Sequence, residues 1–168
     1  MSKQKIAAGF KSFLTKFPKA KLPCTVDEKT SLLASKTNKP LSEDHIRRFL
    51  AEAEEEFDEF TEFVACFRLP ETKNFHAIVV WKGGLLSYEY QLFIYDMKGA
   101  FQSKTRIAGT NVTDDRLHIQ IAEIRSSLEL ALFSGTFSAD TTSPPLQELA
   151  SAGILKLNPA NGEICPES

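Results

Sequence analysis

"FIYDMKGAFQSKTRIAG", residues 93–109, holds two runs of strand-forming residues on either side of a short turn. Asp96 can accept hydrogen bonds from the amides that follow it, and Gly99 can adopt the positive φ that closes a four-residue turn. Beyond the turn, the residues from Phe101 to Ile107 alternate between two faces, as they do along a strand. The stretch therefore predicts a β-hairpin, and sheet construction is enough to explain its residues.

The same two-residue period extends over the chain from about residue 60 onward. Connections between the runs are short, so sequential antiparallel neighbours are the default pairing. We expect 108–115 to be a turn-rich connection and 143–153 to add a helical turn or two. The runs predict a meander of six to eight strands, at 61–69, 75–81, 85–95, 101–107, 116–124 and 127–133 and in a last hairpin within 153–164.

The N-terminal part of the chain has helical spacing instead. Within 3–18, apolar residues recur at intervals of three and four with lysines between them, which predicts an amphipathic helix ended by Pro18 and Pro23. Ser42 can cap a second helix over about 42–55, because acidic residues follow it in the first turn. The segment between the two helices is rich in Lys, Thr and Ser and is expected to be a loop.

These elements predict an α+β fold with N-terminal helices followed by a curved antiparallel β-meander, which can close into a partly open barrel. The length of 168 residues suits a single domain over 1–168. Within it, 1–58 is expected to be mainly helical and 59–168 to form the meander. Thirteen phenylalanines supply much of the apolar area that such a core must bury.

Charge excludes some partners and leaves others open. The net charge is only −2, so no overall field attracts nucleic acid or an anionic membrane. Locally, residues 1–22 hold six lysines and no acid, whereas residues 43–62 hold nine acids and two arginines. Neither an N-terminal apolar run nor a stretch long enough to span a membrane is present in the sequence. We expect a cytoplasmic protein without stable membrane insertion, whose oligomeric state stays open.

No catalytic, metal or cofactor motif emerges from the reactive residues. Cysteines at 24, 66 and 165 are far apart and odd in number, which fits reduced thiols better than a disulfide framework or a zinc site. Histidines at 45, 76 and 118 share no metal-ligand spacing. The paired glycines 83 and 84 have neither spacing of a phosphate-binding loop. We therefore expect no catalytic residues, no metal and no cofactor.

One polar cluster has the chemistry of a binding site. Lys104 and Arg106 follow Gln102 at alternate positions of one predicted strand, and His118 and Gln120 do so on another. On a curved sheet these side chains could present hydrogen-bond donors to an anionic or polar ligand. A sheet face that simply contacts water explains the same pattern. Lys104, Arg106, His118 and Gln120 are thus the candidate ligand-binding residues.

Three stretches resemble segments of a known group of proteins. They are YEYQLFIYDMKGAFQSKTRIAG at 88–109, FLTKFPKAKLP at 13–23 and SSLELALF at 126–133. They are similar to segments of small uncharacterised bacterial proteins common in Bacteroidota, in which such a strand leads into a short glycine turn. The resemblance implies an N-terminal helical segment and a β-meander. It implies no reaction and no functional residues.

The function expected from the sequence is binding without catalysis. Charge-segregated surfaces and the lack of a catalytic set favour a protein-binding or interaction module, and immunity and accessory proteins share this architecture. The alternative is a small-ligand-binding protein whose curved sheet encloses an aromatic-lined cavity. Phe75, Trp81, Tyr88 and Tyr90 would line that cavity, although core packing explains the same aromatic residues.

Overall fold

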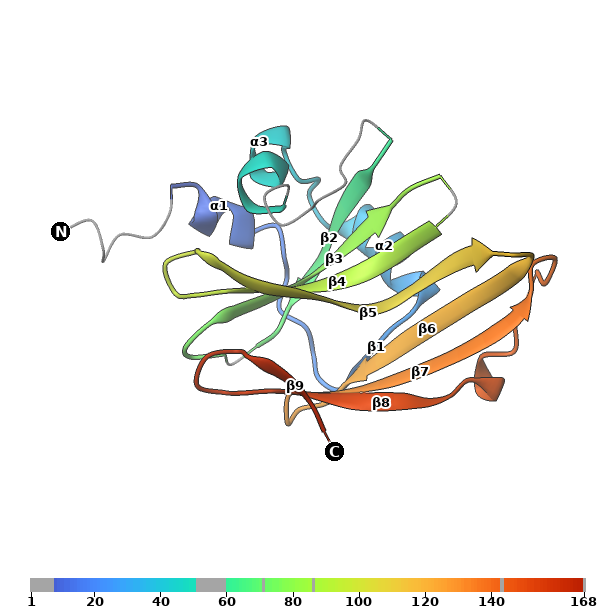
Figure 1. Cartoon of the computed structure of the whole chain (residues 1–168). Coiled ribbons are helices and arrows are strands. Elements are labelled where there is room, and N and C mark those ends of the chain that lie inside the picture. The colour runs from blue at the N-terminus through green and yellow to red at the C-terminus, as the bar shows by residue number, and fades with distance from the viewer. Residues whose placement is uncertain (1–7, 51–59, 71, 86, 143, 168) are drawn as a thin grey trace.

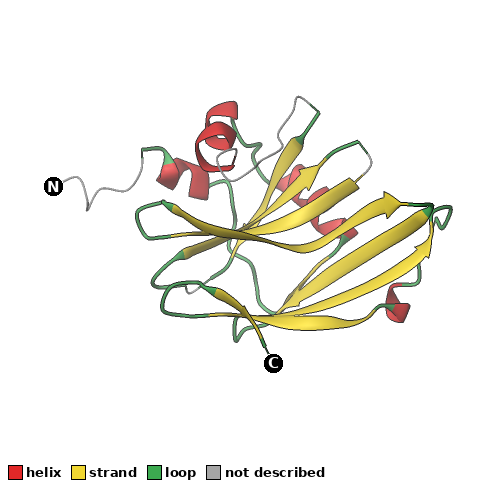
Figure 2. Cartoon of the chain, in the orientation of Figure 1, coloured by secondary structure: helices red, strands yellow, loops and turns green. Residues whose placement is uncertain are grey.

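The computed structural model describes residues 8–50, 60–70, 72–85, 87–142 and 144–167. Short helices precede and flank a large sheet (Figures 1 and 2). The helical elements are α1 (Phe10–Leu14), α2 (Glu28–Thr37), α3 (Glu43–His45), the π-helical turn η2 (Ile46–Leu50) and the 3-10 turn η4 (Leu146–Glu148). The strands are β1 (Cys24–Val26), β2 (Glu62–Arg68), β3 (His76–Gly83), β4 (Ser87–Tyr95), β5 (Phe101–Thr113), β6 (Arg116–Ile124), β7 (Glu129–Ser138), β8 (Ala150–Leu157) and β9 (Ile164–Pro166).

The predicted α+β meander is confirmed. From β2 to β9 each strand pairs antiparallel with the next one in sequence, while β1 pairs with β6. The described part of the chain thus forms one sheet of nine strands. β8 and β9 form the predicted last hairpin, and the three-residue β1 is the strand that the sequence did not predict. β2 and β9 lie at the two ends of the strand order, so the sheet does not close into a barrel.

The hairpin between β4 and β5 has the predicted turn. The Asp96 carboxylate accepts hydrogen bonds from the amides of Lys98 (2.8 Å) and Ala100 (2.9 Å). Gly99 has a φ of 89°, and a Cβ at this position would lie 2.6 Å from the ring of Phe10. Glycine is needed here both for the backbone conformation and for close packing against α1.

β5 is longer than the sequence predicted. The expected loop at 108–115 is strand as far as Thr113, and only Asp114 and Asp115 form the turn. Both aspartates have positive φ (50° and 59°), the conformation of two-residue turns that match the twist of a hairpin. Gly109 and Asn111 suggested a loop, yet both lie in the strand, and each pairs with β4 on one side and with β6 on the other.

A bend in β5 divides the sheet into two halves. β5 pairs with β6 only between Gly109 and Thr113, and β1 pairs with β6 further along, at Ala122–Ile124. Figure 1 shows β5 and β6 diverging from their shared hairpin. A register shift between β4 and β5 leaves Ile107 as an extra residue, and Ile107 and Ala108 are both fully buried. Such a β-bulge bends a strand and changes its twist.

α2 is a helix where the sequence predicted a loop. It buries only Ala34 and exposes Leu32 and Leu33, so it has no apolar stripe that could reveal it. A capping box at Asp27 and Thr30 satisfies its first amides. The Asn38 side chain donates to the carbonyls of Ala65 (2.7 Å) and Cys66 (2.9 Å), at the bulge of β2. Polar contacts at both ends therefore position this helix.

The β2–β4 half of the sheet is buried on both faces. Along β3, Ala77 and Val79 belong to an inner core, while Ile78 and Val80 belong to an outer aromatic cluster. Six aromatic residues of this cluster are fully or almost fully buried, and we call them the outer aromatic cluster: Phe10, Phe13, Phe17, Phe49, Phe93 and Tyr95. The inner core also contains residues of β1 and of the β6–β8 half of the sheet. Its members include Val26, Tyr90, Leu92, Ile107, Ala122, Ile124, Leu130 and Leu157.

The two predicted N-terminal helices are present but short. α1 covers residues 10–14 of the expected 3–18, and residues 1–7 lie outside the described residues. Ser42 caps α3 as predicted, because its hydroxyl accepts from the amide of His45 (3.1 Å). Helical structure continues through η2 to Leu50, and the rest of the expected helix, with the acidic run at 52–59, also lies outside the described residues.

Candidate functional site

Polar residues form rows across four strands of the sheet. Residues that lie directly opposite each other on paired strands share one face. The registers of β4, β5, β6 and β7 place Ser87, Asn111, His118 and Thr136 in one row. An adjacent row on the same face runs through Lys82, Glu89, Gly109, Gln120 and Ser134, from β3 to β7.

An open cleft of about 440 Å³ lies where these rows reach β3 and β4. We call it the polar cleft. Gly83, Gly84 and Ser87 are among its lining residues, and their small size leaves the space open. The described lining residues are Thr61, Lys82, Gly83, Gly84, Ser87, Tyr88, Glu89, Arg106 and Asn111.

Two cations surround one carboxylate in the polar cleft. The Arg106 guanidinium lies 3.4 Å from the Glu89 carboxylate, and Lys82 lies directly opposite Glu89 on β3. The Gln91 side-chain amide donates to the same carboxylate (2.7 Å), although Gln91 is only 3% exposed. Among the described lining residues, the three ionised ones sum to one positive charge. Such a cleft favours an anionic group over a cationic one.

The four candidate residues from the sequence lie on neighbouring strands but not in one pocket. Arg106 lines the polar cleft, and Lys104 lies opposite Phe93, toward the outer aromatic cluster. The ring of His118 lies between the hydroxyls of Thr113 (2.8 Å) and Thr136 (3.2 Å). Gln120 donates to the carbonyl of Ile107 (2.8 Å) and lines a different pocket.

Sequence reasoning missed Lys82, Glu89, Ser87 and Asn111. Each of them occupies an ordinary position of a strand with a polar face, and nothing in the local pattern marks it. Only the pairing register brings them together, and that register depends on the bulge at Ile107. The one available signal is the pair of glycines at 83 and 84, whose spacing fits no phosphate-binding loop.

The four aromatic residues proposed for a cavity have different surroundings. Phe75 and Tyr90 are fully buried in the inner core. Trp81 covers Gly83, where the indole ring leaves no room for a Cβ. Tyr88 lines both the polar cleft and a second, smaller pocket, and Tyr90 lines the second pocket alone.

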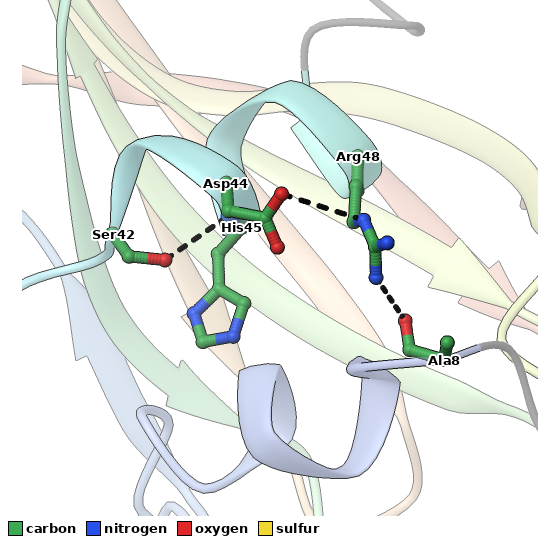
Figure 3. A network of polar contacts seen from close by, with 5 residues as sticks. All are labelled: Ala8, Ser42, Asp44, His45 and Arg48. Atoms are coloured by element: carbon green, nitrogen blue, oxygen red, sulfur yellow. Dashed lines mark hydrogen bonds and ion pairs between the residues drawn. The ribbon is translucent and has the colours of Figure 1, made fainter.

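A separate polar network joins the chain just before α1 to α3 and η2 (Figure 3). Arg48 donates to the carbonyl of Ala8 (2.8 Å) and lies 3.5 Å from the Asp44 carboxylate. The His45 ring points toward α1 and packs against Phe13 and Phe49. His45 is 8% exposed, and its Nδ1 has no hydrogen-bond partner among the described residues.

The buried ring makes stability depend on pH. Burial lowers the pKa of His45, and the nearby charges of Lys16 and Arg48 lower it further against the opposing charge of Asp44. As the pH falls, the imidazole of the unfolded chain binds a proton before the buried imidazole of the folded chain does. The contribution of His45 to the free energy of unfolding is therefore fully present above the ordinary histidine pKa of about 6.5 and decreases as the pH drops below it. Urea unfolding at two pH values should show this loss, and the His45→Phe variant should lose less on acidification. An equal loss in both proteins would contradict this assignment.

The reactive residues of the described chain are dispersed. No group of three His, Cys, Asp or Glu side chains among the described residues is arranged to hold a metal ion. Cys66 is buried, and burial raises its pKa to about 12, while Cys165 is exposed. No helix within the described ranges is long and apolar enough to cross a membrane.

Comparison with known proteins adds no assignment. No protein-family model, no curated protein and no solved structure matches this chain.

Proposed function

We propose that the protein is a non-enzymatic binding module that holds an acidic segment of another protein in the polar cleft. The observation that carries this proposal is the charge arrangement of the cleft, in which Lys82 and Arg106 lie on either side of Glu89. Glu89 holds the Arg106 guanidinium in place, and a partner carboxylate would bind beside Arg106 and Lys82 at the open side of the cleft. A module of immunity or accessory type, acting in the bacterial cytoplasm, would work by such docking.

Exposed apolar residues next in sequence to the lining of the cleft support a protein partner. Leu85 is 81% exposed and follows the lining residue Gly84, while Phe60 is 58% exposed and precedes the lining residue Thr61. Protein interfaces typically combine a few apolar anchors with polar contacts that orient the partner. We therefore expect a bound segment to place an acidic side chain in the cleft and an apolar side chain against Leu85.

Selection from a displayed library of random short peptides tests the proposal. Peptides retained by the wild-type protein should combine Asp or Glu with an apolar neighbour, and their affinity should fall with added salt. The double variant Lys82→Gln with Arg106→Gln should bind them roughly tenfold more weakly, because it removes the attraction for a carboxylate.

The matched control removes two exposed lysines elsewhere. Lys98 and Lys156 lie outside the lining of the cleft, so the double variant Lys98→Gln with Lys156→Gln changes the net charge equally. It should retain wild-type affinity. Equal weakening in both double variants, or selection of peptides without acids, would show that the cleft does not bind a carboxylate.

A further inference from the structure

The second pocket differs from the polar cleft in size, shape and charge. It has a volume of about 160 Å³, is more enclosed, and lies between the start of α2 and the strands β4, β5 and β6. We call it the tyrosine pocket. Its volume equals that of about five water molecules in the liquid, well below the space that a drug-sized ligand needs. Only a compact ligand can fit.

The charge of the tyrosine pocket is negative. Its ionised lining residues are Asp27 and Glu28, and the remaining lining side chains are neutral. The Asp27 carboxylate is engaged in capping α2, where it accepts from the amide of Lys29 (2.9 Å). The helix end contributes roughly half a positive charge, so two carboxylates leave a net negative charge. The pocket thus attracts a cation and repels an anion.

Aromatic and apolar side chains supply the other walls. Tyr88 is half-buried, and its ring meets that of Tyr90 edge-on with 6.0 Å between centroids. Ile119, Ile121 and Leu146 line the pocket as well. An organic cation is attracted to the face of a tyrosine ring, and its methyl or methylene groups favour apolar walls. A hydrated metal ion would gain nothing from these walls.

The electrostatics of Tyr88 agree with this placement. Burial raises the pKa of Tyr88, and the negative charges of Glu28 and Asp27 raise it further, whereas a hydrogen bond with Thr110 opposes the change. The phenol therefore lies within the field of both carboxylates. Tyr90 keeps its hydroxyl occupied, since it donates to the carbonyl of Asp27 (2.7 Å) and accepts from the amide of Ser31 (2.9 Å). These bonds hold the start of α2 beside β4.

We propose that the tyrosine pocket binds a small organic ammonium ion, with Glu28 and Asp27 providing the negative charge and Tyr88 the aromatic wall. This site is distinct from the polar cleft, which shares Tyr88 with it but carries the opposite charge. It also gives the aromatic residues Tyr88 and Tyr90 a ligand-binding role without a large cavity in the sheet.

Titration of the full chain with choline tests the proposal, with NMR chemical shifts of the backbone amides as the readout. Saturable shifts should appear at Thr110, Ile119 and Ile121. The neutral isostere 3,3-dimethylbutan-1-ol has the same shape without the charge, and it should bind at least about fivefold more weakly. Equal binding of the two compounds, or shifts that stay linear with choline, would overturn the proposal.

Three variants locate the site. Glu28→Gln should weaken choline binding about fivefold, Tyr88→Leu should weaken it similarly, and Tyr88→Phe should preserve it because the ring remains. Glu163→Gln removes an acid that lines another cleft, and it should leave binding unchanged. The double variant Lys82→Gln with Arg106→Gln should bind choline as the wild type does. Its effect on peptide binding therefore tests the proposed protein-binding function separately from the ammonium site. Loss of binding in Glu163→Gln or retention in Glu28→Gln would overturn the assignment.

Discussion

Phe13→Ala should destabilise the protein by about 3 to 5 kcal/mol, the usual cost of truncating a fully buried phenylalanine. Phe13 is completely buried at the centre of the outer aromatic cluster. Its ring stacks on Phe49 with 4.8 Å between centroids and meets Phe17 at 5.0 Å and Tyr95 at 6.1 Å. Removing the ring leaves a cavity between α1, η2 and the sheet. Urea unfolding followed by circular dichroism measures the loss.

The matched control for this variant is Leu32→Ala. Leu32 is 61% exposed on α2, so its truncation should change the free energy of unfolding by only a few tenths of a kcal/mol. A Phe13→Ala effect as small as that of Leu32→Ala would mean that the N-terminal segment contributes little to the folded state. The meander alone would then supply nearly all of the stability.

Local sequence patterns predicted the strands because each strand carries its own signal. In β4 the alternate residues Tyr90, Leu92 and Ile94 all lie in the inner core, and the two-residue period is visible without knowing the partner strands. The turn at Asp96 and Gly99 is likewise determined by the properties of its own residues. Features of this kind need no tertiary information.

Elements without a local signal were missed. α2 buries a single alanine, so its position depends on polar contacts such as Tyr90 with Asp27 and Asn38 with β2, which no periodicity reveals. The three-residue β1 is too short for a pattern and forms only because β5 leaves the edge of β6 unpaired beyond Gln120. Pairing between distant segments determines both elements.

Of the four candidate residues predicted from the sequence, only Arg106 lines the polar cleft, so the sequence predicted one member of the site and not its geometry. Alternation on β5 and β6 predicted that Arg106, His118 and Gln120 lie on a polar face. In the structure, Gln120 lies opposite Gly109 and His118 lies opposite Asn111, on the same strand as Arg106. The charge arrangement of the polar cleft also needs β3 and β4, and the register between β4 and β5 depends on two extra residues of β5, Gln102 and Ile107. A shift by one residue would move every side chain of a strand to the opposite face. No local pattern fixes that shift.

The bend of β5 relates the two proposed sites. Gly109 lines the tyrosine pocket, and Arg106 and Asn111 line the polar cleft on either side of it in sequence. A Cβ at Gly109 would lie 2.5 Å from the carbonyl oxygen of Tyr88 and 3.1 Å from a guanidinium nitrogen of Arg106. The backbone therefore approaches β4 closely at this point, and both sites depend on that approach.

Gly109→Ala should destabilise the protein by about 2 to 3 kcal/mol, because it combines a strained backbone with a contact that only a backbone shift can relieve. Gly109 has a φ of 153°, within the region that favours glycine. Gly153 is the matched control, since its φ is 131° but a Cβ there would meet nothing within 4 Å. Urea unfolding of both variants separates the two causes: a larger loss in Gly109→Ala reports the close approach of β5 to β4, whereas equal losses would mean that φ alone sets the cost. If the loss is larger in Gly109→Ala, the backbone shift should also displace Arg106 and Tyr88. Gly109→Ala should then weaken the binding of both choline and acidic peptides, whereas Gly153→Ala should weaken neither.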